Sequence, residues 1–225
     1  MLNLRRFVVG VVAVLLVSGV AYAQALTEIR ARAEQGDVEA QGTLGFLYAT
    51  GQRVPEDDAE AVRWYRLAAA QGDVGVQVIL GRMHADGEGV LEDDAEAVRW
   101  YHQAATQSHV SAQYNLGVMY STGQGAPEDD AEAIRFYRSA AGEGHVPAQF
   151  ILGIMYSIGE GVPQNHQRAY MWAHVAAILT EHKGYIARVV LDVFEERLTP
   201  EQLSRAQALA ATSFNSNFTD CGEPD

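Results

Sequence analysis

The amino-acid sequence predicts an all-α fold, a solenoid of about four helix-pair repeats of 36 residues with capping helices at the C-terminal end. The chain repeats itself, because a Leu-Gly pair recurs every 36 residues, at Leu44, Leu80, Leu116 and Leu152. Each repeat holds two stretches whose apolar residues have helical spacing. A glycine follows the first stretch and an Asp-rich segment opens the second, which indicates a helix end and a helix start. Stacking such hairpins buries apolar sides that one hairpin leaves open.

The first helix of a repeat is clearest over residues 110–120. Ala112, Leu116 and Met119 fall at helical spacing there and predict one buried face. Gly123 follows, and glycine readily adopts the left-handed conformation that ends a helix. We therefore expect this helix to stop at Gly123, and the first helices of the other repeats to stop at the equivalent glycines.

The second helix of a repeat begins at an aspartate, such as Asp129 in the third repeat. The Asp side chain can accept from the amides of the first turn, and Glu132, three residues later, can reach back in a capping box. Large aromatic residues alternate with alanines along these helices. We expect Gly45 and the alanines to let two helix backbones approach, and aromatic side chains such as Trp64 to fill the space toward the next repeat.

Acidic triplets stand at residues 56–58, 92–94 and 128–130. Capping explains them better than a calcium ladder, because acids at a helix start are stabilised by free amides and by the macrodipole. An acidic stripe that attracts a cationic partner is a secondary effect. Arg63 follows Glu60 by three residues, as arginines do in the next two repeats, and this spacing predicts weak ion pairs on the outer face.

The repeated motif supports a family resemblance. Residues 37–180 carry A-Q-x-x-L-G-x-x-Y-x-x-G-x-G-x-x-x-D-x-x-x-A-x-x-W-Y-x-x-A-A, which resembles the Sel1-like repeat, a relative of the tetratricopeptide repeat. The resemblance implies a right-handed α/α superhelix. It also implies a role as an adaptor in assembling membrane-associated complexes and, in bacteria, in envelope regulation or host interaction. Residues 24–36 resemble the second helix of a preceding repeat.

Several positions depart from the motif. Arg53 and Ser108 replace glycines, and His84 replaces the tyrosine. In the fourth repeat Asn165 stands where the others have Asp, and Ala173 stands where they have Tyr. We therefore expect the fourth repeat to be distorted and its second helix to continue into the C-terminal cap.

The N-terminus has the features of a cleavable signal peptide over residues 1–23. Arg5 and Arg6 precede an unbroken apolar run, and Ala21-Tyr22-Ala23 supplies the small residues that a signal peptidase accepts. The apolar run is short for a membrane span, which needs about 20 residues. Residues 7–23 could nevertheless just serve as an uncleaved anchor, which is the alternative. We expect an exported protein, periplasmic or extracellular, with no membrane span after cleavage.

The C-terminal end is predicted to be a cap, residues 181–213, followed by a flexible tail, residues 214–225. One helix is expected over residues 186–197, and Thr199 with Gln202 forms a capping box that opens another. Cys221, the single cysteine, lies in the tail and excludes an internal disulfide framework. We expect a monomer with a free thiol, and the alternative is a dimer through Cys221.

Composition narrows the function further. With 16 Lys+Arg against 29 Asp+Glu the net charge is −13, which argues against nucleic acid as a partner. No catalytic motif, cofactor or metal site is predicted. The only lysine, Lys183, follows Thr180 rather than the serine of an S-x-x-K motif. Histidines such as His166 and His174 are eight residues apart and do not share a helix face. His109 and His145 occupy the same repeat position, just before a first helix. This position favours an inter-repeat hydrogen bond or a solvated side chain over a metal ligand.

The sequence therefore favours a non-enzymatic scaffold that holds a protein or peptide in the concave groove lined by the first helices. The alternative is a β-lactamase-like or cell-wall hydrolase, since a secreted branch of the resembled family is described so, but that branch carries cysteine pairs that this chain lacks. Candidate partner-binding residues vary between repeats and share one helix face. They are Thr43, Phe46, Thr50, Ile79, Arg82, Asp86, Asn115, Val118, Thr122, Ile151, Ile154 and Ile158. Arg82 and Asn115 are the strongest candidates because polar residues there have no packing role. The three isoleucines have the alternative of packing under the C-terminal helices.

Overall fold

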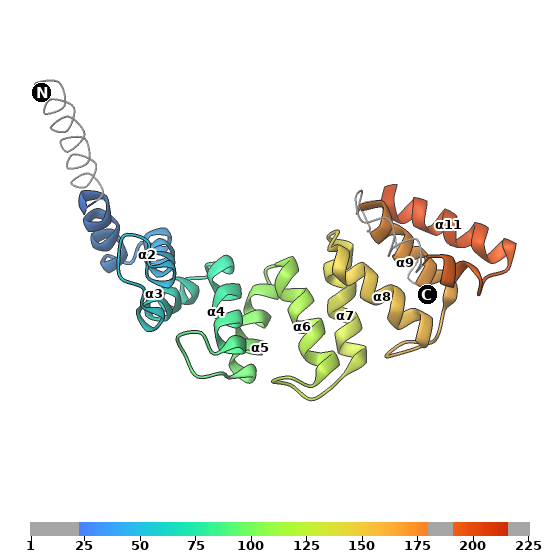
Figure 1. Cartoon of the computed structure of the whole chain (residues 1–225), viewed down its shortest axis with the longest axis horizontal. Helices are drawn as coiled ribbons and strands as arrows, with labels where there is room; N and C mark the ends of the chain where they lie inside the picture. Colours follow the sequence, from blue (N-terminus) through green and yellow to red (C-terminus); the bar gives the residue numbers. More distant parts are fainter. Residues whose placement is uncertain (1–22, 180–190, 216–225) are drawn as a thin grey trace, which may run out of the picture. The chain divides into compact units, whose positions relative to one another are not determined.

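A computed structural model describes residues 23–179 and 191–215, and the regular elements in these ranges are all α-helices (Figure 1). The chain divides between Asp93 and Asp94 into two compact units. The predicted all-α fold of paired helices is confirmed.

The first unit contains a helix over residues 23–34, followed by α2 (Val38–Thr50), α3 (Asp58–Ala70) and α4 (Val74–Asp86). The helices pack in chain order, α2 on α3 and α3 on α4. Their core joins Leu44 and Leu47 of α2 to Trp64 of α3.

The second unit contains α5 (Asp94–Ala105), α6 (Val110–Thr122), α7 (Asp130–Gly142), α8 (Val146–Ile158), α9 (His166–Leu179), a helical turn at 191–195 and α11 (Pro200–Asn215). Two hairpins pair α6 with α7 and α8 with α9, and α11 packs along α9 (Figure 1). Tyr170 and Met171 of α9 share a core with Phe194 and Ala206. The C-terminal helices thus cover α9, and α11 extends to Asn215, two residues into the segment predicted as tail.

Glycines end the first helices as predicted: Gly51, Gly87, Gly123 and Gly159 have φ between 62° and 80°. The aspartate caps are also present, since Asp57 accepts from the Glu60 amide at 3.0 Å. The reciprocal half of the predicted capping box is wrong. The amide of Asp57 donates instead to the carbonyl of Tyr48, at 3.0 Å, because the turn folds it against α2. This leaves Glu60 available to other groups.

The repeated glycine of the Leu-Gly pair has a different role from the one expected. A Cβ added to Gly45 would lie 2.6 Å from the ring of Tyr65, and one added to Gly117 would lie 2.5 Å from the ring of Tyr137. These glycines therefore receive a tyrosine ring and not a neighbouring backbone. In the fourth repeat, where Ala173 replaces the tyrosine, Gly153 instead lies close to the backbone of α9. A Cβ on Gly153 would lie 3.2 Å from the carbonyl oxygen of Ala169.

The glutamine of the motif is a buried connector. Gln41, Gln77 and Gln149 each donate through Nε2, at 3.1 Å, to the carbonyl eight residues earlier, near the end of the preceding helix. Buried polar groups are costly unless they are hydrogen-bonded. Each amide satisfies a helix-end carbonyl and ties the first helix of one repeat to the helix before it.

The departures from the motif are accommodated locally. Arg53 and Ser108 adopt the left-handed conformation of the glycines they replace, with φ of 67° and 60°. The helices of the fourth repeat begin and end in register with those of the other repeats, and the expected distortion is limited to the contact of Gly153 with the α9 backbone. Asn165 caps α9 by accepting from the amide of Arg168 at 3.0 Å, because an amide oxygen accepts as a carboxylate does. The small side chain of Ala173 lets α9 lie close to α8.

Several predictions lie outside the described residues: nearly all of the signal peptide (1–23), Cys221, and parts of the expected helix at 186–197 and of the tail. Within the described ranges, no helix is both long and apolar enough to cross a membrane.

Candidate binding face

The twelve candidate residues lie on α2, α4, α6 and α8, three to a helix. In each trio the last residue is exposed, and the first, such as Asn115 or Ile151, is half-buried. None of the twelve lies in the fully buried core. The structure thus leaves all of them accessible, and their role in binding remains a prediction.

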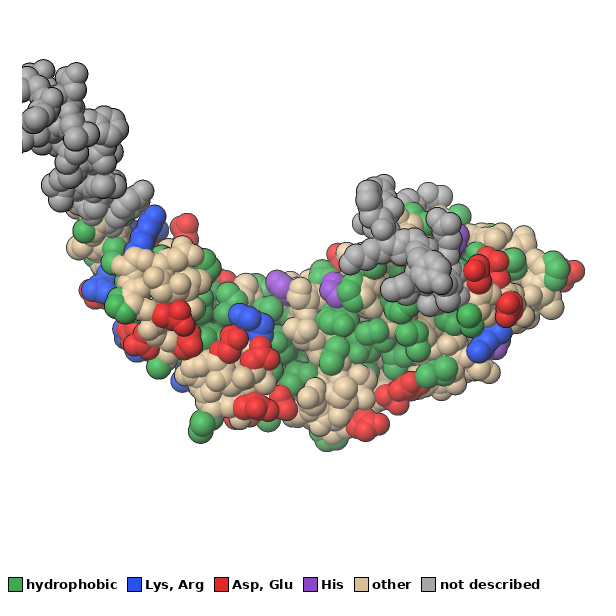
Figure 2. Space-filling model, viewed as in Figure 1, with side chains coloured by type: hydrophobic (Ala, Val, Ile, Leu, Met, Phe, Trp, Pro, Cys, Tyr) green, Lys and Arg blue, Asp and Glu red, His purple; other side chains and the backbone are tan. Residues whose placement is uncertain are grey.

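The second unit presents an uncharged face. Neither α6 nor α8 contains an acidic or basic residue, whereas α7 between them contains four. Hydrophobic side chains gather over α6, α7 and α8 (Figure 2). Ile154 is 40% exposed and Ile158 is 57% exposed, while Val118 and Ile151 are partly buried against the core. We call Asn115, Val118, Ile151, Ile154 and Ile158 the apolar face.

Packing behind this face explains its position. Gly117 of α6 is pressed against Tyr137, and Ser121 lies 3.3 Å from the Tyr137 hydroxyl. On α8, Leu152 and Met155 point into the core. Helical geometry then directs Ile154 and Ile158 to the other side, while Ile151, next to Leu152, stays partly buried against the core. The isoleucines therefore do not all pack under the C-terminal helices, since only Ile151 is substantially covered.

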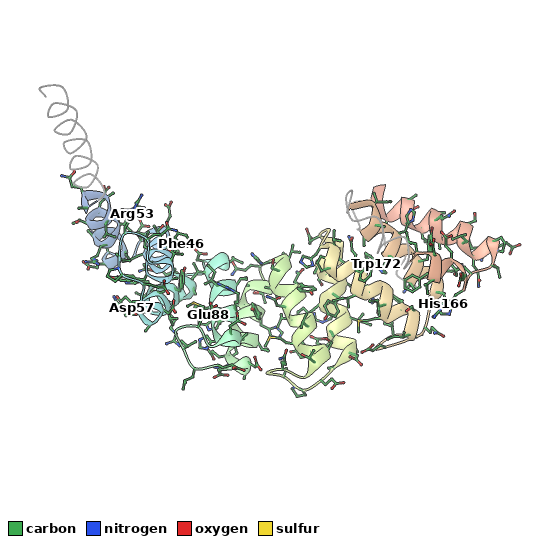
Figure 3. The ribbon with its side chains drawn as sticks, viewed as in Figure 1. Phe46, Arg53, Asp57, Glu88, His166 and Trp172 are labelled. Carbon is green, nitrogen blue, oxygen red and sulfur yellow. The ribbon has the colours of Figure 1, made fainter. Side chains whose placement is uncertain are left out.

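The first unit carries a mixed face. Phe46 of α2 (Figure 3) is 48% exposed. Arg82 of α4 lies 3.8 Å from Glu88, and both side chains are about half exposed. Such a pair contributes little to stability, so the guanidinium can exchange Glu88 for an acidic group of a partner. The hydroxyl of Thr50 donates to the carbonyl of Phe46 at 2.8 Å, which makes Thr50 a weaker candidate than its neighbours.

The arginines on the second helices form the ion pairs that the sequence predicted. Arg63 donates to Glu60 at 3.0 Å and stacks over the ring of Trp64, 4.3 Å from its centre. The Arg63 hydrogen bond lowers the pKa of Glu60. Glu60 also accepts from the Trp64 indole at 3.0 Å. The Glu60–Arg63 pair thus holds the Trp64 ring in place.

Histidines lie in aromatic surroundings. The Nε2 atom of His102 lies 3.0 Å from the Tyr120 hydroxyl, and its ring meets the Phe136 ring edge-on. Burial lowers the pKa of His102. Tyr170 of α9 donates to Glu195 of the C-terminal cap at 3.0 Å and lies beside His174. Among the residues that the structure describes, no group of three or more His, Cys, Asp or Glu is arranged to hold a metal ion.

His145 caps its own helix rather than bonding to another repeat. Its Nδ1 atom accepts from the amide of Ala148 at 3.3 Å, and its ring lies tilted against the ring of Tyr114, with centres 4.6 Å apart. His109 precedes α6 without a side-chain cap bond. The sequence held a signal for this role, because Asp37 and Asp73 at the same repeat position both cap their helices.

Comparison with known families agrees with the geometry. The model of the Sel1 repeat matches residues 38–73, 76–109, 110–145 and 146–180. The chain belongs to the Sel1 repeat family. Members of this family are generally protein-interaction scaffolds, and an enzymatic role is not favoured by the match.

Solved structures show the same fold. A protective antigen of uropathogenic Escherichia coli strains, which displays an SLR fold, is 32% identical over 90% of this chain, with a TM-score of 0.69. The match covers 46% of the antigen, so the chain spans about half its length. A Sel1 repeat protein from Oxalobacter formigenes is 37% identical over 56% of this chain and 95% of its own, with a TM-score of 0.52. No curated protein matches the sequence.

Proposed function

We propose that this protein is an exported, non-enzymatic scaffold that binds a protein or peptide partner on the face formed by the first helices of its repeats. The observation that carries the proposal is the exposure of apolar side chains on that face. Ile154 and Ile158 are 40% and 57% exposed on a helix without charged residues. Exposed apolar side chains grouped on one helix are typical of an interaction site.

Family membership supports the same function, because Sel1 repeats generally serve as interaction scaffolds. The hydrolase alternative has little support. Tyr170 lies beside His174, but its side chain is almost fully buried and out of reach of a substrate. We therefore expect no hydrolysis of a chromogenic β-lactam by purified protein. Hydrolysis that changed with substitutions in the cap would contradict this.

Export is supported by the charge and apolar pattern of residues 1–23. Mass spectrometry of protein recovered from the periplasm or medium should show a chain that begins at Gln24. Recovery only from the cytoplasm, with residues 1–23 intact, would contradict export.

The binding test uses photo-crosslinking in the native compartment. A photoreactive amino acid at position 82 or 115 should crosslink to a partner, and Arg82→Glu should reduce capture while the helical circular dichroism stays unchanged. Arg205→Glu is the matched control, because Arg205 is an exposed arginine on α11 and is not one of the candidate residues of the first helices. Equal capture by wild type and Arg82→Glu would remove Arg82 from the site. No crosslink from either position would contradict the scaffold proposal.

A further inference from the structure

The apolar face has an acidic edge. Glu128 lies against the last turn of α6, since a Cβ added to Gly123 would lie 3.5 Å from the Cβ of Glu128. Glu160 is exposed in the turn directly after α8. Figure 2 shows Asp and Glu side chains along the loops that border the hydrophobic area. The carboxyl ends of α6 and α8 add the negative ends of their helix dipoles, so this edge attracts a positive charge.

The basic residues of the same repeats are held elsewhere. Arg138 and Arg168 both donate to the hydroxyl of Tyr156, and Arg135 pairs with Glu132. Within residues 23–179 and 191–215, neither Glu128 nor Glu160 forms an ion pair. No basic side chain in the described part of the chain therefore pairs with these two carboxylates.

Asn115 adds a polar group to the apolar face. Its side chain is half-buried on α6 and forms no hydrogen bond within the described residues. A primary amide both donates and accepts, as a peptide group does. Such an amide matches the exposed backbone of an extended peptide, whereas a helical peptide has already paired its own backbone groups.

Charge also restricts the occupant. A second copy of this chain brings another net charge of −13, and an anionic membrane surface is negative as well. Both are repelled at long range, while a basic partner is attracted. The apolar face is uncharged in its centre and negative at one edge, so a complementary partner is apolar and carries a positive charge at one end.

We propose, building on the scaffold function, that the apolar face binds an extended segment of a partner protein that carries apolar side chains and, about three residues away, a Lys or Arg. The spacing follows from helix geometry. Seven residues separate Ile151 from Ile158, which at about 1.5 Å per residue is about 10 Å along α8. Three extended residues span about the same length. Apolar side chains rest on Val118 and Ile154, the backbone meets the Asn115 amide, and the basic residue reaches Glu128 or Glu160.

The test is a selection from a library of capped, randomised heptapeptides against the purified full-length chain. Selected sequences should combine Ile, Leu, Val or Phe with a Lys or Arg about three positions away. For one selected peptide, Ile154→Ser should weaken binding about tenfold, since burial of such a side chain contributes about 1.5 kcal/mol or more. Val193→Ser is the matched control, because Val193 is 44% exposed in the C-terminal cap.

A charge-reversed pair tests the edge. The double variant Glu128→Lys/Glu160→Lys should bind the selected peptide more weakly, and should bind more strongly the peptide variant in which Glu replaces the basic residue. Glu196→Lys, at an exposed position in the cap, should leave both affinities unchanged. The proposal would be overturned by a preference for acidic or uncharged peptides, or by a loss of peptide affinity with Val193→Ser equal to that with Ile154→Ser. Binding only to helical peptides, or only to phosphatidylcholine vesicles, would also overturn it. If crosslinks at position 115 still capture a partner, the scaffold function survives that result. If neither crosslinks nor peptides appear, both proposals fail.

Discussion

Replacement of Gly117 by alanine should destabilise the second unit, although alanine is normally the better helix residue. The added Cβ would lie 2.5 Å from the ring of Tyr137, about 1 Å inside an ordinary carbon contact of about 3.5 Å. Tyr137 is buried, with Ser121 beside its hydroxyl and Tyr114 beside its ring, so it has little room to move. Overpacking of this kind costs up to about 3 kcal/mol. Removal of a helical glycine offsets about 1 kcal/mol, which leaves a net loss of about 2 kcal/mol.

Urea and thermal unfolding followed by far-ultraviolet circular dichroism measures this loss. A change of about 2 kcal/mol should lower Tm by about 4–8 °C in a domain of this size. Gly75→Ala is the control, because a Cβ there meets only Asp73, at 3.5 Å, and the variant should be as stable as wild type or more so. The double variant Gly117→Ala/Tyr137→Ala should lose less stability than the sum of the losses in the two single variants, because the ring that the new methyl group meets is absent. Unchanged or increased stability of Gly117→Ala would refute the ring-in-glycine packing.

Three further changes follow from the helix ends and the histidines. His109→Asp should stabilise α6 by about 1 kcal/mol in urea unfolding, because aspartate at this repeat position accepts from the third helical amide, as Asp73 does. Ser108→Gly should add about 0.5–1 kcal/mol, since the left-handed φ of 60° costs a non-glycine residue about 1–2 kcal/mol and glycine is entropically unfavourable by less. Burial lowers the pKa of His102 in the folded protein, so the unfolded state binds the proton more readily. The stability that neutral His102 contributes is therefore fully present above pH 6.5 and is lost as the pH falls through the lower pKa of the folded protein. The urea midpoint of the wild type should fall between pH 7.5 and 5.5, and His102→Gln should reduce this fall.

Matched variants separate these effects from general changes in helix stability. His145→Asp should gain less than His109→Asp, because His145 already caps α8. Ser111→Gly, at an exposed position inside α6, should lose stability where Ser108→Gly gains it. A pH response that is identical in wild type and His102→Gln would show that the fall comes from other groups, and gains of equal size at His109 and His145 would remove the capping argument.

Spacing and local chemistry were sufficient to predict much of the fold. The helices end at Gly51 and Gly123 because a positive φ is a property of one residue and its neighbours. Asp57 caps α3 for the same reason, since its partner amide is three residues away. The accessible face could also be predicted, because helical periodicity alone separates Leu152 from Ile154.

Contacts between residues far apart in the sequence had to be seen in the structure. The motif contains a glycine and a tyrosine 20 residues apart, but only packing shows that the ring of Tyr65 occupies the space beside Gly45. The role of Gln41 depends likewise on a carbonyl of the preceding helix. The amide of Asp57 could bond to its own Glu60 or to Tyr48, and the fold of the turn decided for Tyr48.

By itself, therefore, the sequence determined the repeat, the helix boundaries and the side of each helix that faces outward, because these depend on interactions within a few residues. The tertiary structure decided which buried groups meet, and which charges border the apolar face of α6 and α8. Glu128 reaches the end of α6 only because the following turn folds back onto it, and closure of that turn depends on packing that no local pattern encodes.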